Sequence, residues 1–201
     1  MDKRRDLLDG ALTVFARDGY TRASIEALAK AGGVSTRTIY NQFGDKATLF
    51  HAVIQDSAEQ VAAAHIGMIH RYLTKIIDVE ADLIEFARVW ASPLPEFDVH
   101  FALVRQVHAE ARHIPPAALA AWQESGPLRV RDELAAALRR IADAGHLEIE
   151  DAELAASHFT HLVSGDATSR LHRGADPLPA AEIHRLSDAG VRAFLHGYGK
   201  R

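Results

Sequence analysis

The 201-residue sequence contains no cysteine, which excludes disulfides, thiol nucleophiles and thiolate metal ligands. Long hydrophobic runs are also missing, because no stretch approaches the roughly 20 apolar residues that cross a bilayer. The opening residues, MDKRRDLLDG, lack the apolar segment of a secretory signal peptide. We therefore expect a cytoplasmic protein with no membrane partner.

Motifs of the common enzyme classes are absent as well. The sequence has no Gly-x-x-x-x-Gly-Lys phosphate loop, no Gly-x-Ser-x-Gly nucleophile elbow and no dinucleotide fingerprint. Its 12 histidines include a pair on one helix face, His158 and His161. A metal would need three or four suitably spaced ligands, and neither His-Glu-x-x-His nor cysteine is available. We expect no catalytic residues, no cofactor and no metal site.

The alternating pattern of a β-strand does not occur, whereas apolar residues recur at helical spacing throughout. The sequence therefore predicts an all-α fold of about nine or ten helices whose ends are marked by glycine and proline. The apolar stripe of the first helix has only the next two helices to bury against, so we expect these three to share a small core. The expected helices cover residues 2–18, 24–31, 35–43, 45–76, 80–91, 97–112, a short segment after Pro116, 127–145, 151–165 and 179–195, with a loop over 166–178.

The most informative stretch is residues 24–50, SIEALAKAGGVSTRTIYNQFGDKATLF. Ser24 and Ser35 are each suited to cap a helix, because a serine hydroxyl accepts a hydrogen bond from the exposed amides of the first turn. Gly32 and Gly33 end the first helix, since glycine adopts the left-handed conformation without steric strain. The second helix presents hydroxyl, Arg, Tyr and Asn side chains outward. This arrangement is typical of a helix-turn-helix.

These residues resemble the tetracycline-repressor (TetR) family of bacterial transcriptional regulators. Ala23 departs from the pattern, because the family often has threonine there, and Ser24 must then cap the helix alone. A looser resemblance, over RQVHAEARHIPPAALAAWQESGP and DAGHLEIEDAELAASHF, links the C-terminal half to an AefR-like subgroup. The family positions that match in register are Phe15, Gly19, Tyr20, Ser24, Ile25, Ala29, Gly32, Gly33, Val34, Ser35, Ile39, Tyr40, Phe43, Lys46, Leu49 and Phe50.

The resemblance implies that the second of these helices enters the major groove of DNA. Arg37 can bond both acceptors of a guanine edge. Tyr40 and Lys46 resemble family positions that contact phosphates. Alternatively, Ser24 and Ser35 are only caps and Arg37 is an ordinary surface charge. The candidate DNA-binding residues are Thr21, Arg22, Ser24, Ser35, Thr36, Arg37, Thr38, Tyr40, Asn41 and Lys46.

Charge is distributed unevenly, with a net +2 on residues 1–46 and −6 on residues 47–201. A basic N-terminal segment followed by an acidic remainder is typical of a protein that binds phosphates through one end. Lys3, Arg4 and Arg5 either reach phosphates or form a solvated terminus. We expect residues 1–46 to be a helix-turn-helix DNA-binding domain and residues 47–201 an effector-binding and dimerisation domain, joined by the long helix that starts near residue 45.

The resemblance also implies a homodimer formed through the last two helices. Their apolar faces lie beside small residues that permit close helix approach, unless these faces are simply core within one chain: Ala155, Ala156, Ala189, Gly190 and Ala193. In this family the middle helices enclose an effector pocket. Arg105 is of interest because a charge beside apolar neighbours needs a partner, which Glu110, Glu85 or an anionic effector could supply. The candidate ligand-binding residues, which are otherwise ordinary core, are Phe86, Trp90, Phe101, Arg105, His108 and Trp122, with His113 nearby.

Taken together, the sequence predicts a ligand-responsive transcriptional regulator. We expect a repressor that binds a palindromic double-stranded operator as a dimer and is released by a small-molecule effector. Two alternatives stay open. A helical protein that regulates by binding another protein would show little salt-dependent DNA affinity. An enzyme built on a helical body would show turnover that survives Arg37→Ala.

Overall fold

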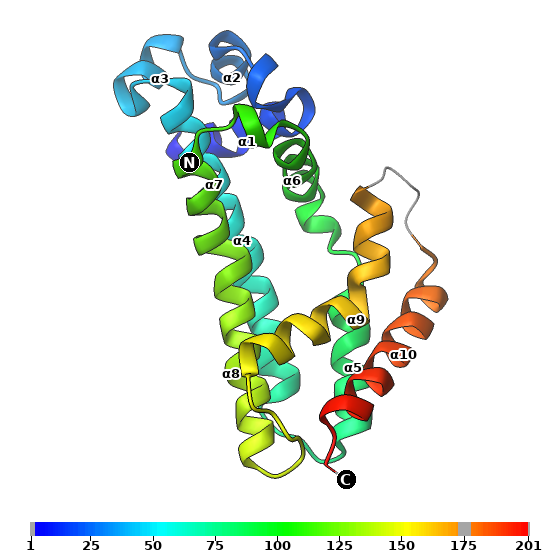
Figure 1. The fold of residues 1–201 in the computed structure, drawn as a ribbon. Helices are drawn as coiled ribbons and strands as arrows, with labels where there is room; N and C mark the ends of the chain where they lie inside the picture. Colours follow the sequence, from blue (N-terminus) through cyan, green and yellow to red (C-terminus); the bar gives the residue numbers. More distant parts are fainter. Residues whose placement is uncertain (1–2, 173–177, 201) are drawn as a thin grey trace. The chain divides into compact units, whose positions relative to one another are not determined.

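The computed structural model describes residues 3–172 and 178–200 (Figure 1). Helices account for most of this range, and within it the one β-type pairing is an isolated bridge between Leu147 and Gly199. The all-α prediction is therefore confirmed. The ten α-helices of the described ranges are α1 (Lys3–Arg22), α2 (Ile25–Ala31), α3 (Thr36–Phe43), α4 (Lys46–Leu73), α5 (Val79–Ala91), α6 (Asp98–Glu110), α7 (Pro116–Gln123), α8 (Arg129–Asp143), α9 (Ala152–His172) and α10 (Ala180–Tyr198), with short turns η1 (Pro95–Phe97), η2 (Ala111–His113) and η3 (Glu124–Leu128) between them.

The chain divides into two compact units. Unit 1 comprises Met1–Ala62 and Leu94–Leu128, and unit 2 comprises Ala63–Pro93 and Arg129–Arg201. Helix α4, 28 residues long, begins in unit 1 and ends in unit 2, as its predicted length required. This division follows packing, and it differs from the functional boundary predicted after residue 46 because α6 and α7 pack with the N-terminal helices.

The core of unit 1 is larger than the three-helix core predicted from the sequence. Helix α1 buries a stripe that includes Leu7 and Phe15, and the Phe15 ring meets that of Phe50 on α4 edge-on at 4.9 Å between centroids. Leu103 and Val107 of α6 belong to the same buried cluster. The first three helices supply only part of this core, and α4, α6 and α7 supply the remainder.

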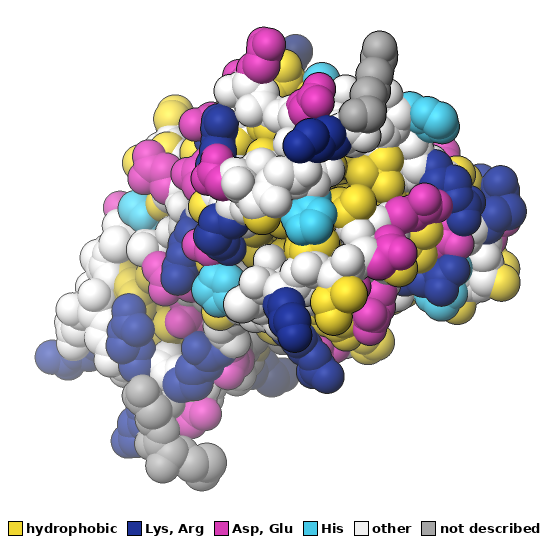
Figure 2. Space-filling view, turned by 90° about the horizontal axis from the view of Figure 1, so that it is seen from below, with side chains coloured by type: hydrophobic (Ala, Val, Ile, Leu, Met, Phe, Trp, Pro, Cys, Tyr) yellow, Lys and Arg dark blue, Asp and Glu magenta, His cyan; other side chains and the backbone are white. Residues whose placement is uncertain are grey.

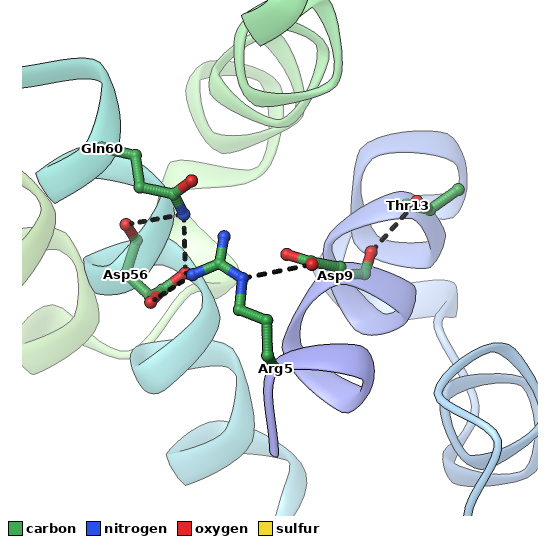
Figure 3. Close-up of polar contacts among 5 residues, drawn as sticks. All are labelled: Arg5, Asp9, Thr13, Asp56 and Gln60. Carbon is green, nitrogen blue, oxygen red and sulfur yellow. Dashed lines mark hydrogen bonds and ion pairs between the residues drawn. The ribbon is translucent and has the colours of Figure 1, made fainter. Parts of the chain in front are cut away.

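Arg5 connects α1 to α4 (Figure 3). Its Nη1 donates to both carboxylate oxygens of Asp56 at 3.1 Å, and its Nε donates to Asp9 at 3.2 Å. Gln60 donates to the same Asp56 carboxylate at 2.9 Å. The sequence left open whether Arg5 reaches phosphates or belongs to a solvated terminus. The structure shows neither role for Arg5. Its guanidinium is part-buried and holds two helices together.

The connection between α7 and α8 differs from the helix start predicted at Gly126 and Pro127, because α8 begins at Arg129. The chain passes instead through the π-helical turn η3, which contains Pro127. Proline has no amide to donate and crowds the preceding turn, and the wider π-turn relieves both conflicts. Gly126 permits this turn to pack against α4, because a Cβ there would lie 3.1 Å from the Cβ of Ala58.

Helix α9 extends seven residues beyond Gly165, the residue at which the sequence predicted its end. Gly165 adopts helical backbone, and no proline or capping residue follows it until the end of the helix. The predicted loop over 166–178 is therefore wrong up to His172, and residues 173–177 lie outside the described part of the chain. A lone glycine weakens a helix by about 1 kcal/mol and does not by itself end it.

Unit 2 is built on close packing of α9 and α10. A Cβ on Gly190 would lie 2.3 Å from the carbonyl oxygen of Leu162, so only glycine permits this approach. Ser187 is fully buried, and its hydroxyl reaches the carbonyl oxygens of Val163 and Ile183. Phe159 packs edge-on against another core phenylalanine at 5.2 Å. Gly190 and Ser187 thus serve packing within the chain, and so do the buried Ala155 and Ala156, whereas Ala189 and Ala193 are exposed.

Charges on the face drawn in Figure 2 are mixed in sign. Lys and Arg side chains alternate there with Asp and Glu, and hydrophobic side chains reach the surface between them. Such mixing is typical of a solvated surface and differs from the one-sided basic surface of a nucleic-acid interface. None of the helices within the described ranges combines the length and apolar character needed to cross a bilayer.

Candidate nucleic-acid interface

The helix pair predicted from residues 24–50 is present, with both serine caps in place. The Ser24 hydroxyl accepts from the amide of Ala27 at 3.1 Å, and the Ser35 hydroxyl accepts from the amide of Thr38 at 3.1 Å. Both serines have extended backbone, as capping residues do. Gly33 lies in the left-handed region at φ +64°, which turns the chain from α2 into α3.

Helix α3 is amphipathic and presents one polar face. Ile39 is fully buried beneath it, whereas Arg37 and Asn41 are exposed and Tyr40 is 53% exposed. Across the described residues, nothing forms a hydrogen bond or ion pair with the Arg37 guanidinium. An exposed tyrosine and an unengaged guanidinium on one short helix are suited to meet base edges and phosphates.

Asp45 begins α4 as the sequence predicted. Its carboxylate accepts from the amide of Thr48 at 2.7 Å, and this hydrogen bond holds the pKa of Asp45 below its usual value. The negative charge also lies at the positive end of the helix dipole. The cap therefore fixes the point where the chain leaves α3 and enters the long helix.

Lys46, the first residue of α4, has partners that the sequence did not indicate. Its ammonium donates to the carbonyl oxygens of Tyr20 at 3.0 Å, Thr21 at 3.2 Å and Ala23 at 3.1 Å. The same nitrogen lies 4.9 Å from the centroid of the Tyr20 ring. An ammonium has three N–H donors, and all three are engaged within the chain. Lys46 thus neutralises the carbonyl end of α1, where a positive charge is favoured.

Thr21 is also engaged. Its backbone amide donates to Oε2 of Glu110 at 2.9 Å, and its hydroxyl donates to the same oxygen at 3.0 Å. The amide is free to do so because Gly19, at φ +77°, interrupts the helical hydrogen bonding of α1. From the sequence, Glu110 was expected only as a partner for Arg105. The one sequence signal was its position near the end of the helix predicted over 97–112.

Arg22 lies on the exposed surface beside this contact. Its Nε donates to the carbonyl oxygen of Asp18 at 3.0 Å. Arg17 makes two bonds of 2.7 Å to the Asp18 carboxylate and thereby lowers its pKa. The remaining predicted residues Thr36 and Thr38 are half-buried on α3, and the Thr38 hydroxyl lies 2.9 Å from that of Ser35.

The predicted ligand-binding residues fall into both units. In unit 2, Phe86 is fully buried, with its ring centroid 5.4 Å from that of Trp90 and 5.7 Å from that of Phe159. Phe86 is therefore part of a packed core, which is the alternative that the sequence left open. Trp90 is only partly buried, and its ring meets His65 edge-on at 5.0 Å.

The other four lie in unit 1. His108 and Trp122 meet edge-on at 5.7 Å between α6 and α7, and Phe101 is partly buried beside His100. Arg105 is exposed, so the premise that its charge lies near the core was wrong. Water solvates an exposed guanidinium, which then needs no buried partner.

A buried polar pair in unit 1 was not predicted from the sequence. Ser57 on α4 is 4% exposed, His100 on α6 is 6% exposed, and the Ser57 hydroxyl lies 2.7 Å from Nδ1 of His100. The signal was available in part, because His100 precedes Leu103 and Val104 by three and four residues and so lies on the buried face. The described residues contain no cluster of three potential metal ligands.

Among the described residues of unit 2, two surface hollows are of interest. One, of about 610 Å³, lies between α5 and α10 and is open to solvent. The other, of about 340 Å³, is mainly apolar and follows α9 and α10. The residues that line the second hollow are His158, His161, Leu162, Ala193, Phe194, Gly197 and Tyr198.

A capped helix pair with an exposed Arg, Tyr and Asn face, in an all-helical chain, defines a helix-turn-helix transcriptional regulator. Family comparison agrees. Residues 7–53 match the family described as bacterial regulatory proteins, tetR family, and residues 85–200 match the AefR-like transcriptional repressor C-terminal domain. Because the second match alone spans more than half of the chain, this protein belongs to the TetR family of transcriptional regulators.

Whole-chain relatives support the assignment. The HTH-type transcriptional repressor Rv1474c of Mycobacterium tuberculosis is 29% identical over 194 residues, which cover 94% of this chain and 93% of that protein. A TetR-family transcriptional regulator from Mesorhizobium loti superposes with a TM-score of 0.88 at 29% identity, covering 98% of this chain and 97% of that one. The flavonoid-responsive regulator FrrA superposes with a TM-score of 0.71, also at 29% identity, over 99% and 98% of the two chains.

Proposed function

We propose that this protein is a homodimeric repressor that binds a palindromic operator and is released by a small-molecule effector. The DNA-binding part of this proposal is supported by the polar face of α3. Arg37 is exposed there and has no hydrogen-bond or ion-pair partner within the described part of the chain. Arg37 reads guanine, and Tyr40 with Asn41 contacts the flanking backbone or bases. Residues 1–46 act as the DNA-binding domain.

Lys46 has a different role in this proposal from the phosphate contact predicted by the sequence. Its three donors hold the carbonyl end of α1 against the start of α4. Lys46 therefore positions the helix-turn-helix, and phosphates are contacted by Tyr40, Thr36 and Thr38. Ser24 and Ser35 act mainly as caps, since each hydroxyl already accepts an amide hydrogen.

Dimerisation follows from the way a single helix-turn-helix binds DNA. One such module makes few base contacts, and symmetric pairs read two half-sites about one helical turn apart. Helices α9 and α10 are the proposed interface, because Leu154 is 49% and Leu162 is 44% exposed there beside the apolar hollow. Ala189 and Ala193 are exposed too, whereas Ala155, Ala156 and Gly190 are buried within the chain and are not part of this surface.

The effector is proposed to bind within residues 47–201, the effector-binding and dimerisation domain predicted from the sequence. The name of FrrA describes a flavonoid-responsive protein, which supports a small organic effector for a chain of this fold. Because α4 begins at the DNA-binding domain and ends in unit 2, a shift of α4 would move the recognition helix. The effector must bind the DNA-incompetent form more tightly than the competent form for this to release DNA.

The test is footprinting of wild type and Arg37→Ala on the DNA upstream of the protein's own gene, followed by selection from random duplexes if no site is found. Wild type should protect a near-palindrome with affinity that falls as salt rises. Arg37→Ala should lose about 10- to 100-fold in affinity and the preference at one position of each half-site. Arg140→Ala is the matched control, because Arg140 is also exposed, on α8.

Two outcomes would contradict the proposal. Absence of any sequence preference in both the upstream DNA and the selection would favour the alternative of a regulator that binds another protein. Equal losses for Arg37→Ala and Arg140→Ala would show that only overall charge matters. A protected palindrome that requires Arg37 supplies the operator with which effectors can be screened.

A further inference from the structure

The carboxylate of Glu110 occupies an oxyanion site at the edge of the helix-turn-helix. One of its oxygens accepts both the backbone amide and the hydroxyl of Thr21, at 2.9 and 3.0 Å. An amide and a hydroxyl that converge on one oxygen are the same kind of donors that bind DNA phosphates. Thr21 is one of the candidate DNA-binding residues predicted from the sequence, and here its donors are occupied by an acidic side chain of the protein itself.

The backbone at Gly19 leaves room for the carboxylate of Glu110. Gly19 has φ +77°, and a Cβ at that position would lie 2.3 Å from Oε1 of Glu110 and 3.2 Å from Oε1 of Gln106. Two side chains one turn apart on α6 therefore approach α1 where glycine leaves room. The positive φ also removes the helical acceptor for the Thr21 amide, so that this donor faces α6.

A positive charge lies on the other side of the same peptide. Lys46 donates to the carbonyl oxygen of Tyr20, which belongs to the peptide group whose amide donates to Glu110. The ammonium polarises that peptide and makes its N–H a stronger donor. The site therefore favours an oxyanion, and either a carboxylate or a phosphate satisfies it.

We propose that Glu110 competes with a DNA phosphate for Thr21, and that α6 thereby sets operator affinity. This inference rests on the proposed function. The Thr21 donors cannot serve both anions at once, and a phosphate close to them would meet the negative charge of Glu110 at short range. The observed arrangement is the blocked state of this contact. Withdrawal of the end of α6 frees Thr21 and strengthens DNA binding.

The experiment measures the dissociation constant of wild type, Glu110→Gln and Thr21→Val proteins and of the double variant. The probes are the operator fragment and a random-sequence duplex of the same length. Glu110→Gln should bind both duplexes about tenfold more tightly at low salt, and this gain should shrink as salt screens the repulsion. Glu96→Gln is the control, since Glu96 is an exposed acid elsewhere in unit 1, and its gain should be much smaller.

The decisive readout is non-additivity. Thr21→Val should change affinity little in the wild-type background, where Glu110 already occupies the hydroxyl. In the Glu110→Gln background the same substitution should remove much of the gain, because the phosphate then loses a donor. If Glu110 only stabilised the position of α1, Thr21→Val would change DNA affinity by the same factor with glutamate or glutamine at position 110.

Weaker binding by Glu110→Gln, or a gain that is the same with threonine or valine at position 21, would overturn the inference. If Glu110→Gln does not fold, Glu110→Asp keeps the charge and withdraws it by one methylene, and a smaller gain is expected. The random duplex separates this result from failure of the proposed function, because competition for phosphates acts on any DNA. Loss of sequence preference alone would contradict only the proposed function.

Discussion

Lys46 and Glu110 bind opposite ends of one peptide group, that between Tyr20 and Thr21. The ammonium of Lys46 takes the carbonyl oxygen at 3.0 Å, and the carboxylate of Glu110 takes the amide at 2.9 Å. Lys46 is the first residue of α4 and Glu110 is the last residue of α6. The end of α1 is therefore held by the start of one helix and the end of another, and four substitutions test how the fold depends on such contacts.

Lys46→Met should lower the free energy of unfolding by about 1–3 kcal/mol, because three carbonyl oxygens lose a charged donor. The salt dependence of DNA binding should be unchanged, since Lys46 is proposed to position α1 and not to contact phosphate. Urea unfolding and a salt series of dissociation constants measure the two effects. Lys30→Met, at an exposed site on α2, is the control and should change stability by less than about 0.5 kcal/mol. A shallower salt slope with unchanged stability would restore the phosphate role predicted by the sequence.

Gly19→Ala should destabilise the protein more than Gly44→Ala does. Both glycines have positive φ, 77° with ψ 172° at Gly19 and 78° with ψ −49° at Gly44, so each substitution introduces backbone strain of about 1–3 kcal/mol. Only the alanine at position 19 also collides with Glu110, whereas nothing lies within 4 Å of a Cβ at position 44. Unfolding of both variants in the Glu110→Ala background provides the check. The extra destabilisation of Gly19→Ala relative to Gly44→Ala should become smaller there, and an unchanged difference would show that the collision with Glu110 is not its cause.

Gly190→Ala should destabilise unit 2 by about 1–3 kcal/mol, because the new methyl group would overlap the backbone of α9. A Cβ at this position would lie only 2.3 Å from the carbonyl oxygen of Leu162, and backbone cannot rotate away as a side chain can. Gly67→Ala on α4 is the matched substitution at an open helical site, and it should stabilise by about 0.5–1 kcal/mol. Thermal or urea unfolding with opposite signs for the two variants is the expected result. Equal effects would mean that helix propensity dominates at both sites.

The ion pair between Arg88 and Asp188 should make stability depend on acid pH. Two hydrogen bonds of 2.7 and 2.6 Å from Arg88 lower the pKa of Asp188 below its usual 3.8. Since the folded state binds this proton less readily than the unfolded state, the stabilisation is present above pH 3.8 and is lost as the pH falls through the folded value.

Asp188→Asn should therefore lower the free energy of unfolding by about 1 kcal/mol near neutral pH, and the difference from wild type should shrink as the pH falls below 3.8 and the carboxylate becomes protonated. The same comparison with Asp143→Asn, an exposed acid on α8, should show little difference at either pH. A deficit of Asp188→Asn that persists undiminished in strong acid would mean that packing, and not the charge pair, supplies the stabilisation.

The sequence predicted the helix-turn-helix nearly residue by residue because its signals are local. A serine cap acts on an amide three residues away, as Ser24 does on Ala27, and a glycine turn needs only its own backbone freedom. Helical periodicity places Ile39 inward and Arg37 outward without reference to the rest of the chain. The same locality explains the failure at Gly165, where α9 continues. A glycine is compatible both with a helix end and with a helix that continues, and packing decides between them.

Tertiary structure alone decided which charged groups are engaged. Thr21 and Glu110 are 89 residues apart in the chain, and Arg5 and Asp56 are 51 apart, so no spacing rule connects them. Exposure of Arg105, burial of His100 and recruitment of α6 into the N-terminal core likewise follow from how helices pack. The sequence by itself determined the helices, their caps and the recognition face, because these depend on neighbouring residues. Tertiary packing determined whether a side chain on these helices is available to contact DNA, because a charged group pairs with whichever partner the fold brings close to it.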